Sequence, residues 1–204
     1  MADFYLASAS PRRRDLLRQV GARFETLLLR VAAPRGPDVP EVPAHGEEGA
    51  QYVLRVATGK AEAGRRAALA RGLLHRPVLG ADTEVILDGE VLGKPRDLVH
   101  AAQMLRRLAG REHEVLTAIA IAPAGPGAAA SRLSVSRVWI RALSDEEIAR
   151  YCAGREPLGK AGAYALQGRG AAFVERVEGS CSGIVGLPLS QTVELLAGAG
   201  ILLP

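Results

Sequence analysis

Apolar positions in this chain follow two alternating spacings, one typical of strands and one typical of helices. Short apolar or alternating runs predict strands at residues 3–8, 23–29, 113–122, 132–142 and 171–179. Apolar positions three and four apart predict helices at residues 11–20, 47–71, 97–110, 144–154 and 189–199. Because strands and helices alternate, the pattern predicts an α/β protein with a mixed, twisted sheet flanked by helices.

The segment 77–95 carries the densest strand and turn signals. It predicts a strand, a second strand, an Asp88-Gly89 turn and a return strand, because Asp-Gly between alternating apolar residues favours a hairpin. The proline-rich residues 32–46 predict an extended loop before the long helix. We expect one domain over residues 1–204, within which hairpin strands and a helix at about 112–155 could form a sub-lobe.

The first predicted helix begins with chemistry suited to an anion. Ser10 is a good N-cap, but Arg12, Arg13 and Arg14 add positive charge to a helix end that is already positive. The hydroxyls of Ser8 and Ser10, free backbone N–H groups and guanidinium groups together suit a phosphate. The alternative is that the arginines are simply solvated, which is the commoner outcome for any one of them.

Three further polar side chains stand among apolar residues or on a rigid turn. Lys60 lies on the apolar stripe of its predicted helix, so it either snorkels to water or points into a cleft. Asp82 follows the apolar run VLGA, where a carboxylate can hold Mg²⁺ or accept a proton; a turn aspartate bonded to its own backbone is equally common. Lys94, in the sequence GKP, is either surface decoration or a phosphate clamp.

Gln167 and His113, which lie in two other segments, each allow a functional and a structural interpretation. The Gly- and Ala-rich segment 159–170 lets the backbone approach a ligand, and Gln167 within it could contact a base edge. The alternative for this segment is a flexible turn before a strand. His113 lies on a predicted strand, where we expect packing rather than catalysis.

Composition narrows the function classes. With 204 residues, 48% of them hydrophobic and 24% charged, the chain is typical of a globular protein. Aromatic residues make up 4%, which argues against stacking of single-stranded nucleic acid, and the net charge of +4 favours small anionic partners. Two cysteines and four dispersed histidines give no disulfide framework or zinc cluster. No signal pattern or apolar run of ~20 residues is found, so we expect a cytoplasmic location without membrane attachment.

Five motifs together resemble the Maf family of nucleoside triphosphate pyrophosphatases. They are LASASPRRRDLL, GADTEVILDGEVLGKPRD, GREHEVLTAIAI, EPLGKAGAYALQGRG and GIVGLPL, in family order over nearly the whole chain. The resemblance implies an α/β fold, similar to that of ITPase-like proteins, with a cleft between two lobes. It also implies hydrolysis of a nucleoside triphosphate to the monophosphate and pyrophosphate, with a divalent metal, Mg²⁺ or Mn²⁺.

The matched positions also imply roles for individual residues. Asp82 would be the proton acceptor or a metal carboxylate, and the triphosphate would be neutralised by Arg13, Lys60 and Lys94. The positions associated with base choice are Arg12, Thr83 and Gln167. Thr83 and Gln167 resemble the subgroup acting on dTTP and UTP, whereas Gln and Glu are expected in the 7-methyl-GTP subgroup. The implied substrate is a pyrimidine triphosphate or a modified one, and the implied role is to remove it from the nucleotide pool.

Two departures from the family pattern concern carboxylates. Ala32 and Ala33 stand where members often carry an acidic pair, for which Asp38 or Glu41 could substitute if the loop folds back; Gly159 replaces the Asp of EPxDKAG. Fewer carboxylates would weaken the hold on Mg²⁺. The alternatives are therefore a weakly active or inactive nucleotide-binding regulator of the same fold and, less consistent with the charge, a nucleic-acid-binding protein. The sequence does not decide whether the protein forms a homodimer.

Overall fold

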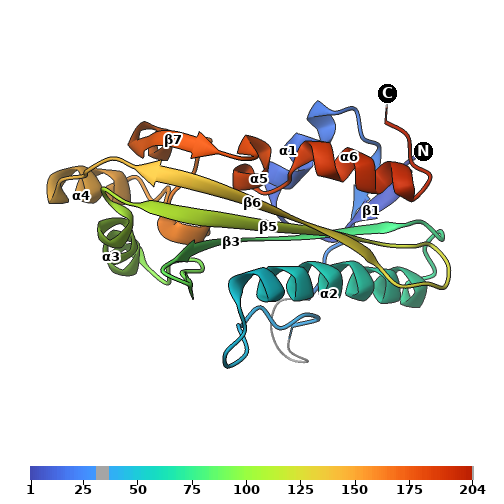
Figure 1. The fold of residues 1–204 in the computed structure, drawn as a ribbon. Helices are drawn as coiled ribbons and strands as arrows, with labels where there is room; N and C mark the ends of the chain where they lie inside the picture. Colours follow the sequence, from blue (N-terminus) through green and yellow to red (C-terminus); the bar gives the residue numbers. More distant parts are fainter. Residues whose placement is uncertain (31–36, 204) are drawn as a thin grey trace.

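The computed structural model of the protein, which describes residues 1–30 and 37–203, is built on one mixed β-sheet (Figure 1). The sheet has the strand order β2-β1-β3-β5-β6-β7, with β4 pairing with β3. The strands are β1 (Phe4–Leu6), β2 (Phe24–Thr26), β3 (Val78–Leu87), β4 (Glu90–Val91), β5 (Glu112–Ala122), β6 (Ala130–Ile140) and β7 (Val174–Glu178). β1 is parallel to β2 and β3, and all other pairs are antiparallel, which confirms the predicted mixed sheet.

Helices cover both faces of the sheet. They are α1 (Pro11–Gln19), α2 (Gly49–Ala70), α3 (Leu98–Leu108), α4 (Asp145–Ala153), α5 (Cys181–Val185) and α6 (Leu189–Gly198), with 3₁₀ turns η1 (Ala161–Ala163) and η2 (Arg169–Phe173). In Figure 1, α2 lies along one face, α1 and α6 lie on the opposite face, and α3 and α4 gather at the far end of the long strands. Separate buried apolar clusters underlie these three groups of helices.

Two helix starts follow directly from local sequence. Ser10 caps α1 by accepting a hydrogen bond from the backbone N–H of Arg13. Ser144 and Glu147 form a capping box at α4, in which each side chain accepts from the other residue's backbone N–H. These interactions satisfy N–H groups that have no partner within the helix.

The structure corrects several of the elements predicted from the sequence. Residues 78–87 form one strand rather than two, because β3 pairs with β5 continuously from Val78 to Ile86. The second predicted strand shortens to Phe24–Thr26, because only these residues pair with β1. A short helix, α5, was not predicted, since its five residues are too few to show a helical period.

One edge of β3 is left open in its middle, and this opening positions the site. β1 pairs with β3 only at Val78 and Leu79, and β4 pairs only at Ile86 and Leu87. Residues 80–85 therefore have a partner strand, β5, on one edge only. The opening lies beyond the carboxyl end of β1, the kind of position where ligands bind in open α/β sheets.

Across residues 1–30 and 37–203, none of the helices has both the length and the apolar character that crossing a membrane requires.

Candidate active site

A cavity of about 680 Å³ lies against the open edge of β3. Its walls come from the start of α1, the middle of α2, β3, the Lys94 loop, residues 159–167 and residues 184–186. The residues to which the sequence assigned roles in catalysis, phosphate binding or base choice all line it: Ser8, Ser10, Arg12, Arg13, Lys60, Asp82, Thr83, Lys94 and Gln167. Segments from across the chain thus meet at one hollow large enough for a nucleotide-sized ligand.

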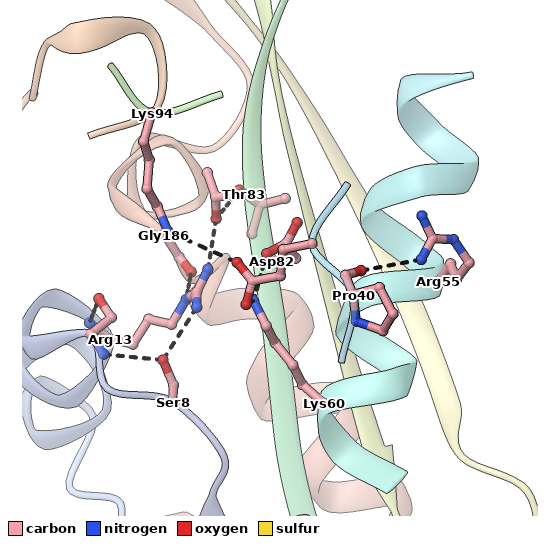
Figure 2. Close-up of polar contacts among 12 residues, drawn as sticks. Ser8, Arg13, Pro40, Arg55, Lys60, Asp82, Thr83, Lys94 and Gly186 are labelled. Carbon is pink, nitrogen blue, oxygen red and sulfur yellow. Dashed lines mark hydrogen bonds and ion pairs between the residues drawn. The ribbon is translucent and has the colours of Figure 1, made fainter. Parts of the chain in front are cut away.

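Close packing of α2 on β3 brings Lys60 to Asp82. A Cβ at Gly80 would lie 2.5 Å from both the carbonyl oxygen of Ala57 and the backbone nitrogen of Ala61, so only glycine allows this approach. Two residues further along the same face, Asp82 Oδ1 accepts a hydrogen bond from Lys60 Nζ at 2.8 Å (Figure 2). The Lys60 side chain is 12% exposed, so it points into the cavity rather than snorkelling to open water.

Arg13 crosses from α1 to β3 and is fixed by three acceptors. Its Nε donates to the Gly186 carbonyl at 2.8 Å, its Nη1 to Ser8 Oγ at 3.2 Å and its Nη2 to Thr83 Oγ1 at 3.2 Å (Figure 2). Thr117 on β5 donates a further hydrogen bond to Thr83 Oγ1. Burial lowers the pKa of Arg13, and the nearby charge of Asp82 opposes that effect. The three acceptors are uncharged, so the guanidinium charge remains free to attract an anion.

The other predicted residues lie around the rim. Arg12 Nε donates to the Val185 carbonyl at 3.3 Å, and Ser8 Oγ accepts from the Ser10 backbone N–H. Lys94 reaches toward the cavity from its loop with a side chain that is 58% exposed (Figure 2). Gln167 is exposed on the wall formed by residues 159–167. These side chains are placed to contact a ligand without first being released from a buried network.

The two substitute carboxylates suggested by the sequence separate in the structure. Glu41 lines the cavity, where its Oε1 lies 2.9 Å from Lys60 Nζ and its Oε2 lies 3.9 Å from Lys94 Nζ. Asp38 instead forms hydrogen bonds with the backbone and side chain of Arg30. Ala32 and Ala33 lie outside the described residues. Gly159 lines the cavity at φ +74 and brings no carboxylate.

Two lining residues were missed by the sequence analysis. Glu84 is 7% exposed, and burial followed by the negative charge of Asp82 raises its pKa to about 7. Lys160 lines the cavity as well, and burial followed by the positive charge of Arg12 lowers its pKa. The two-residue alternation of a strand could have revealed Glu84, because it places that residue on the face of Asp82.

His113 lies away from the cavity wall and packs as expected. It is buried, and its Nε2 forms a 2.7 Å hydrogen bond with the Tyr164 hydroxyl. Burial lowers the pKa of His113 to about 4. The imidazole is therefore neutral near neutral pH and stabilises the contact between β5 and the segment carrying Tyr164.

The chemistry available in the cavity is that of a polyanion site. Cationic groups of Arg13, Lys60 and Lys94 surround the carboxylate of Asp82, whose Oδ2 is buried and has no hydrogen-bond partner among the described residues. The same part of the chain holds no group of three or more His, Cys, Asp or Glu side chains arranged to bind a metal unaided. Any cation here would need oxygen ligands from a substrate or water as well.

Comparisons of sequence and structure relate this chain to known proteins. Proteins called dTTP/UTP pyrophosphatase from Nitrosospira multiformis and Ralstonia nicotianae are each 52% identical to this chain, over 97% and 98% of it and over 94% and 95% of their own lengths. The solved structure of the Staphylococcus aureus Ham1 protein aligns with a TM-score of 0.45 and 16% identity, over 67% of this chain and 71% of that one, a likeness too distant to support an argument. A profile of the family described as Maf-like protein matches residues 3–199, and the chain therefore belongs to the Maf family.

Proposed function

We propose that this protein is a pyrophosphatase that hydrolyses dTTP and UTP to the monophosphate and pyrophosphate. The observation that carries the proposal is the meeting of Arg13, Lys60, Lys94 and Asp82 around one cavity, from segments far apart in the sequence. Relatives named dTTP/UTP pyrophosphatase, half identical over almost the full chain, support the choice of substrate.

The cationic side chains would bind and neutralise the triphosphate. Arg13 is held in place by Gly186, Ser8 and Thr83, so little conformational entropy is lost when it meets a phosphate. Lys60 is shared between Asp82 and Glu41 and would exchange the Glu41 contact for a phosphate oxygen. In phosphoryl chemistry such positioning and charge stabilisation account for most of the rate.

Asp82 would orient the attacking water and accept its proton. A bond forms between the water oxygen and the α-phosphorus, and the bond from that phosphorus to the bridging oxygen breaks, so pyrophosphate leaves with the electron pair. Lys60 fixes one oxygen of the Asp82 carboxylate, which leaves Oδ2 to face the attacking water either directly or through a bound cation. This division of the two oxygens suits a base that must not rotate during catalysis.

The site also fits a divalent cation, because Asp82 Oδ2 is a buried carboxylate oxygen without a partner among the described residues. Mg²⁺ prefers such oxygen ligands and is commonly bound by one or two carboxylates together with substrate phosphates. Asp82 would hold Mg²⁺ or Mn²⁺, which when bound would stabilise negative charge on the phosphates and lower the pKa of water.

Base choice would be made at the rim by Arg12, Thr83 and Gln167. Gln167 is exposed on the cavity wall and has an amide that can donate and accept, as the edge of a uracil or thymine requires. Thr83 would act through Arg13, whose Nη2 donates to its hydroxyl. Ser8 and Ser10 would contribute hydroxyl donors to a phosphate next to Arg13.

The test is a panel of nucleoside triphosphates with Mg²⁺ or Mn²⁺, in which released pyrophosphate is converted to phosphate and measured. We expect dTTP and UTP to be hydrolysed faster than dATP, dGTP or 7-methyl-GTP. Asp82→Asn should lose most turnover while still binding nucleotide, because the substitution removes the base but leaves the cationic side chains in place. Pyrophosphate release by Asp82→Asn at the wild-type rate would refute this role.

A second candidate is a regulator that binds nucleotide without hydrolysing it. The observation that favours it is the replacement of carboxylates by Ala32, Ala33 and Gly159. The same panel separates the two candidates, because the regulator would bind dTTP and release no pyrophosphate. The cytoplasmic location and the absence of nucleic-acid binding stay predictions, and the oligomeric state stays open.

A further inference from the structure

Glu84 is a carboxylate in the cavity to which the proposed mechanism gives no role. It lies on β3 two residues after Asp82, so both side chains leave the strand on the same face. Both residues line the cavity and are at least nine-tenths buried, with 5% of Asp82 and 7% of Glu84 exposed. Two residues of a strand span about 6.6 Å, a distance over which two flexible side chains can converge on one ion.

Both side chains present an unsatisfied oxygen. Asp82 Oδ2 and Glu84 Oε2 are buried, and no described residue donates a hydrogen bond to either atom. Lys60 is already bonded to Asp82 Oδ1 and to Glu41, and Lys94 lies nearest to Glu41. Two buried carboxylate oxygens without donors on adjacent, like-charged side chains are costly unless a cation joins them.

The charge around the cavity leads to the same conclusion. Apart from Arg30, which pairs with Asp38, the described lining residues include five cationic and three acidic side chains: Arg12, Arg13, Lys60, Lys94, Lys160, Glu41, Asp82 and Glu84. This surplus of two positive charges falls short of the about four negative charges on a nucleoside triphosphate. One divalent cation would supply the difference.

We propose that Glu84 is the second carboxylate of the cation site, providing Oε2 beside Asp82 Oδ2 for Mg²⁺ or Mn²⁺. This inference rests on the proposed function for its choice of cation. In this arrangement β3 itself supplies a second carboxylate, in a chain that carries Ala32 and Ala33 in place of an acidic pair. Glu41 is then a counter-ion of Lys60 and Lys94 and not a ligand.

The test measures Mn²⁺ binding directly, from the loss of the electron paramagnetic resonance signal of free Mn²⁺. Titrations are made with the full chain alone and with α,β-imido-dUTP, which the enzyme cannot cleave at the α-phosphorus. Glu84→Gln keeps the shape and removes the charge, and it should weaken Mn²⁺ binding at least about tenfold, as expected for loss of a metal-ligand contact. Glu84→Asp keeps a carboxylate on a shorter side chain, so its Mn²⁺ affinity should lie between that of wild type and that of Glu84→Gln.

Glu41→Gln is the matched control, because it removes the same charge from the same cavity. It should change the Mn²⁺ dissociation constant less than about threefold, since screened charge alone acts on the ion. Thermal unfolding checks that each variant is folded, and Glu84→Gln should be at least as stable as wild type because a buried charge is removed.

Each outcome decides the inference. Wild-type Mn²⁺ affinity in folded Glu84→Gln overturns it, and a larger loss in Glu41→Gln than in Glu84→Gln transfers the ligand role to Glu41 and overturns it too. The proposed function is tested by a different assay. If it is wrong, wild-type protein will release no pyrophosphate from dTTP or UTP, whatever its Mn²⁺ affinity.

Discussion

Gly80 is a position where a single added methyl group should disturb the site, because backbone atoms of α2 lie directly against it. The Cβ of alanine would lie 2.5 Å from two backbone atoms of α2, whereas ordinary contacts begin at 3.4 Å, so the helix must retreat by the difference of about 0.9 Å. The 2.8 Å contact between Lys60 and Asp82 would then stretch toward about 3.7 Å, beyond hydrogen-bond distance.

The expected cost has two parts. Overpacking of this kind destabilises proteins by about 1–3 kcal/mol, which for a chain of this size lowers Tm by about 2–12 °C. A misplacement near 1 Å in an active site costs up to about 100-fold in rate, so kcat/KM for dTTP should fall by about 10- to 100-fold. Differential scanning fluorimetry and the pyrophosphate assay measure the two effects.

Gly198→Ala is the matched control. A Cβ at Gly198 meets no atom within 4 Å, and alanine is the better helix former, so Tm should stay the same or rise slightly. If Gly80→Ala kept both the Tm and the kcat/KM of wild type, the close approach of α2 would not be what positions Lys60.

Three other predictions use different features of the structure. Arg13→Lys keeps the charge but cannot reproduce the contacts to Gly186, Ser8 and Thr83, so kcat/KM should fall at least about tenfold, and an unchanged value would refute the anchoring role. The pKa of His113 is about 4 in the folded protein and about 6.5 in the unfolded chain. As the pH falls, the unfolded chain therefore binds this proton at a higher pH than the folded protein does. The free energy of unfolding should therefore decline by about 2–3 kcal/mol between pH 6.5 and 4, and urea titrations should show a shallower decline in His113→Gln; parallel declines would contradict this. Removal of divalent cations with EDTA should abolish pyrophosphate release and added Mn²⁺ should restore it, whereas full activity in EDTA would exclude the cation role of Asp82.

Local sequence was sufficient for features that depend on few neighbouring residues. The N-cap at Ser10 and the capping box at Ser144 involve only residues three positions apart, and both are confirmed. The Asp88-Gly89 turn is also confirmed, with both residues at positive φ between β3 and β4. Such features can be read from residue type and spacing because no distant contact is needed to form them.

The remaining features depend on tertiary contacts. The continuous β3 needed β5 as its partner, and the position of Lys60 needed the close approach of α2 at Gly80. Glu41 is held in the cavity by lysines from α2 and from the Lys94 loop, which no local pattern reveals. The alternation of side chains along a strand could have placed Glu84 on the same face as Asp82. Its burial could not be predicted, because it depends on the helix packed against that face.

The most direct test of the central claim is the hydrolysis of dTTP in water labelled with ¹⁸O. Attack at the α-phosphorus, assisted by Asp82 among the converging cationic side chains, predicts one ¹⁸O atom in dTMP and none in pyrophosphate. Mass spectrometry should find this label with wild-type protein and almost no labelled dTMP with Asp82→Asn. Label in pyrophosphate, or dTDP and phosphate as the products, would contradict the proposed attack.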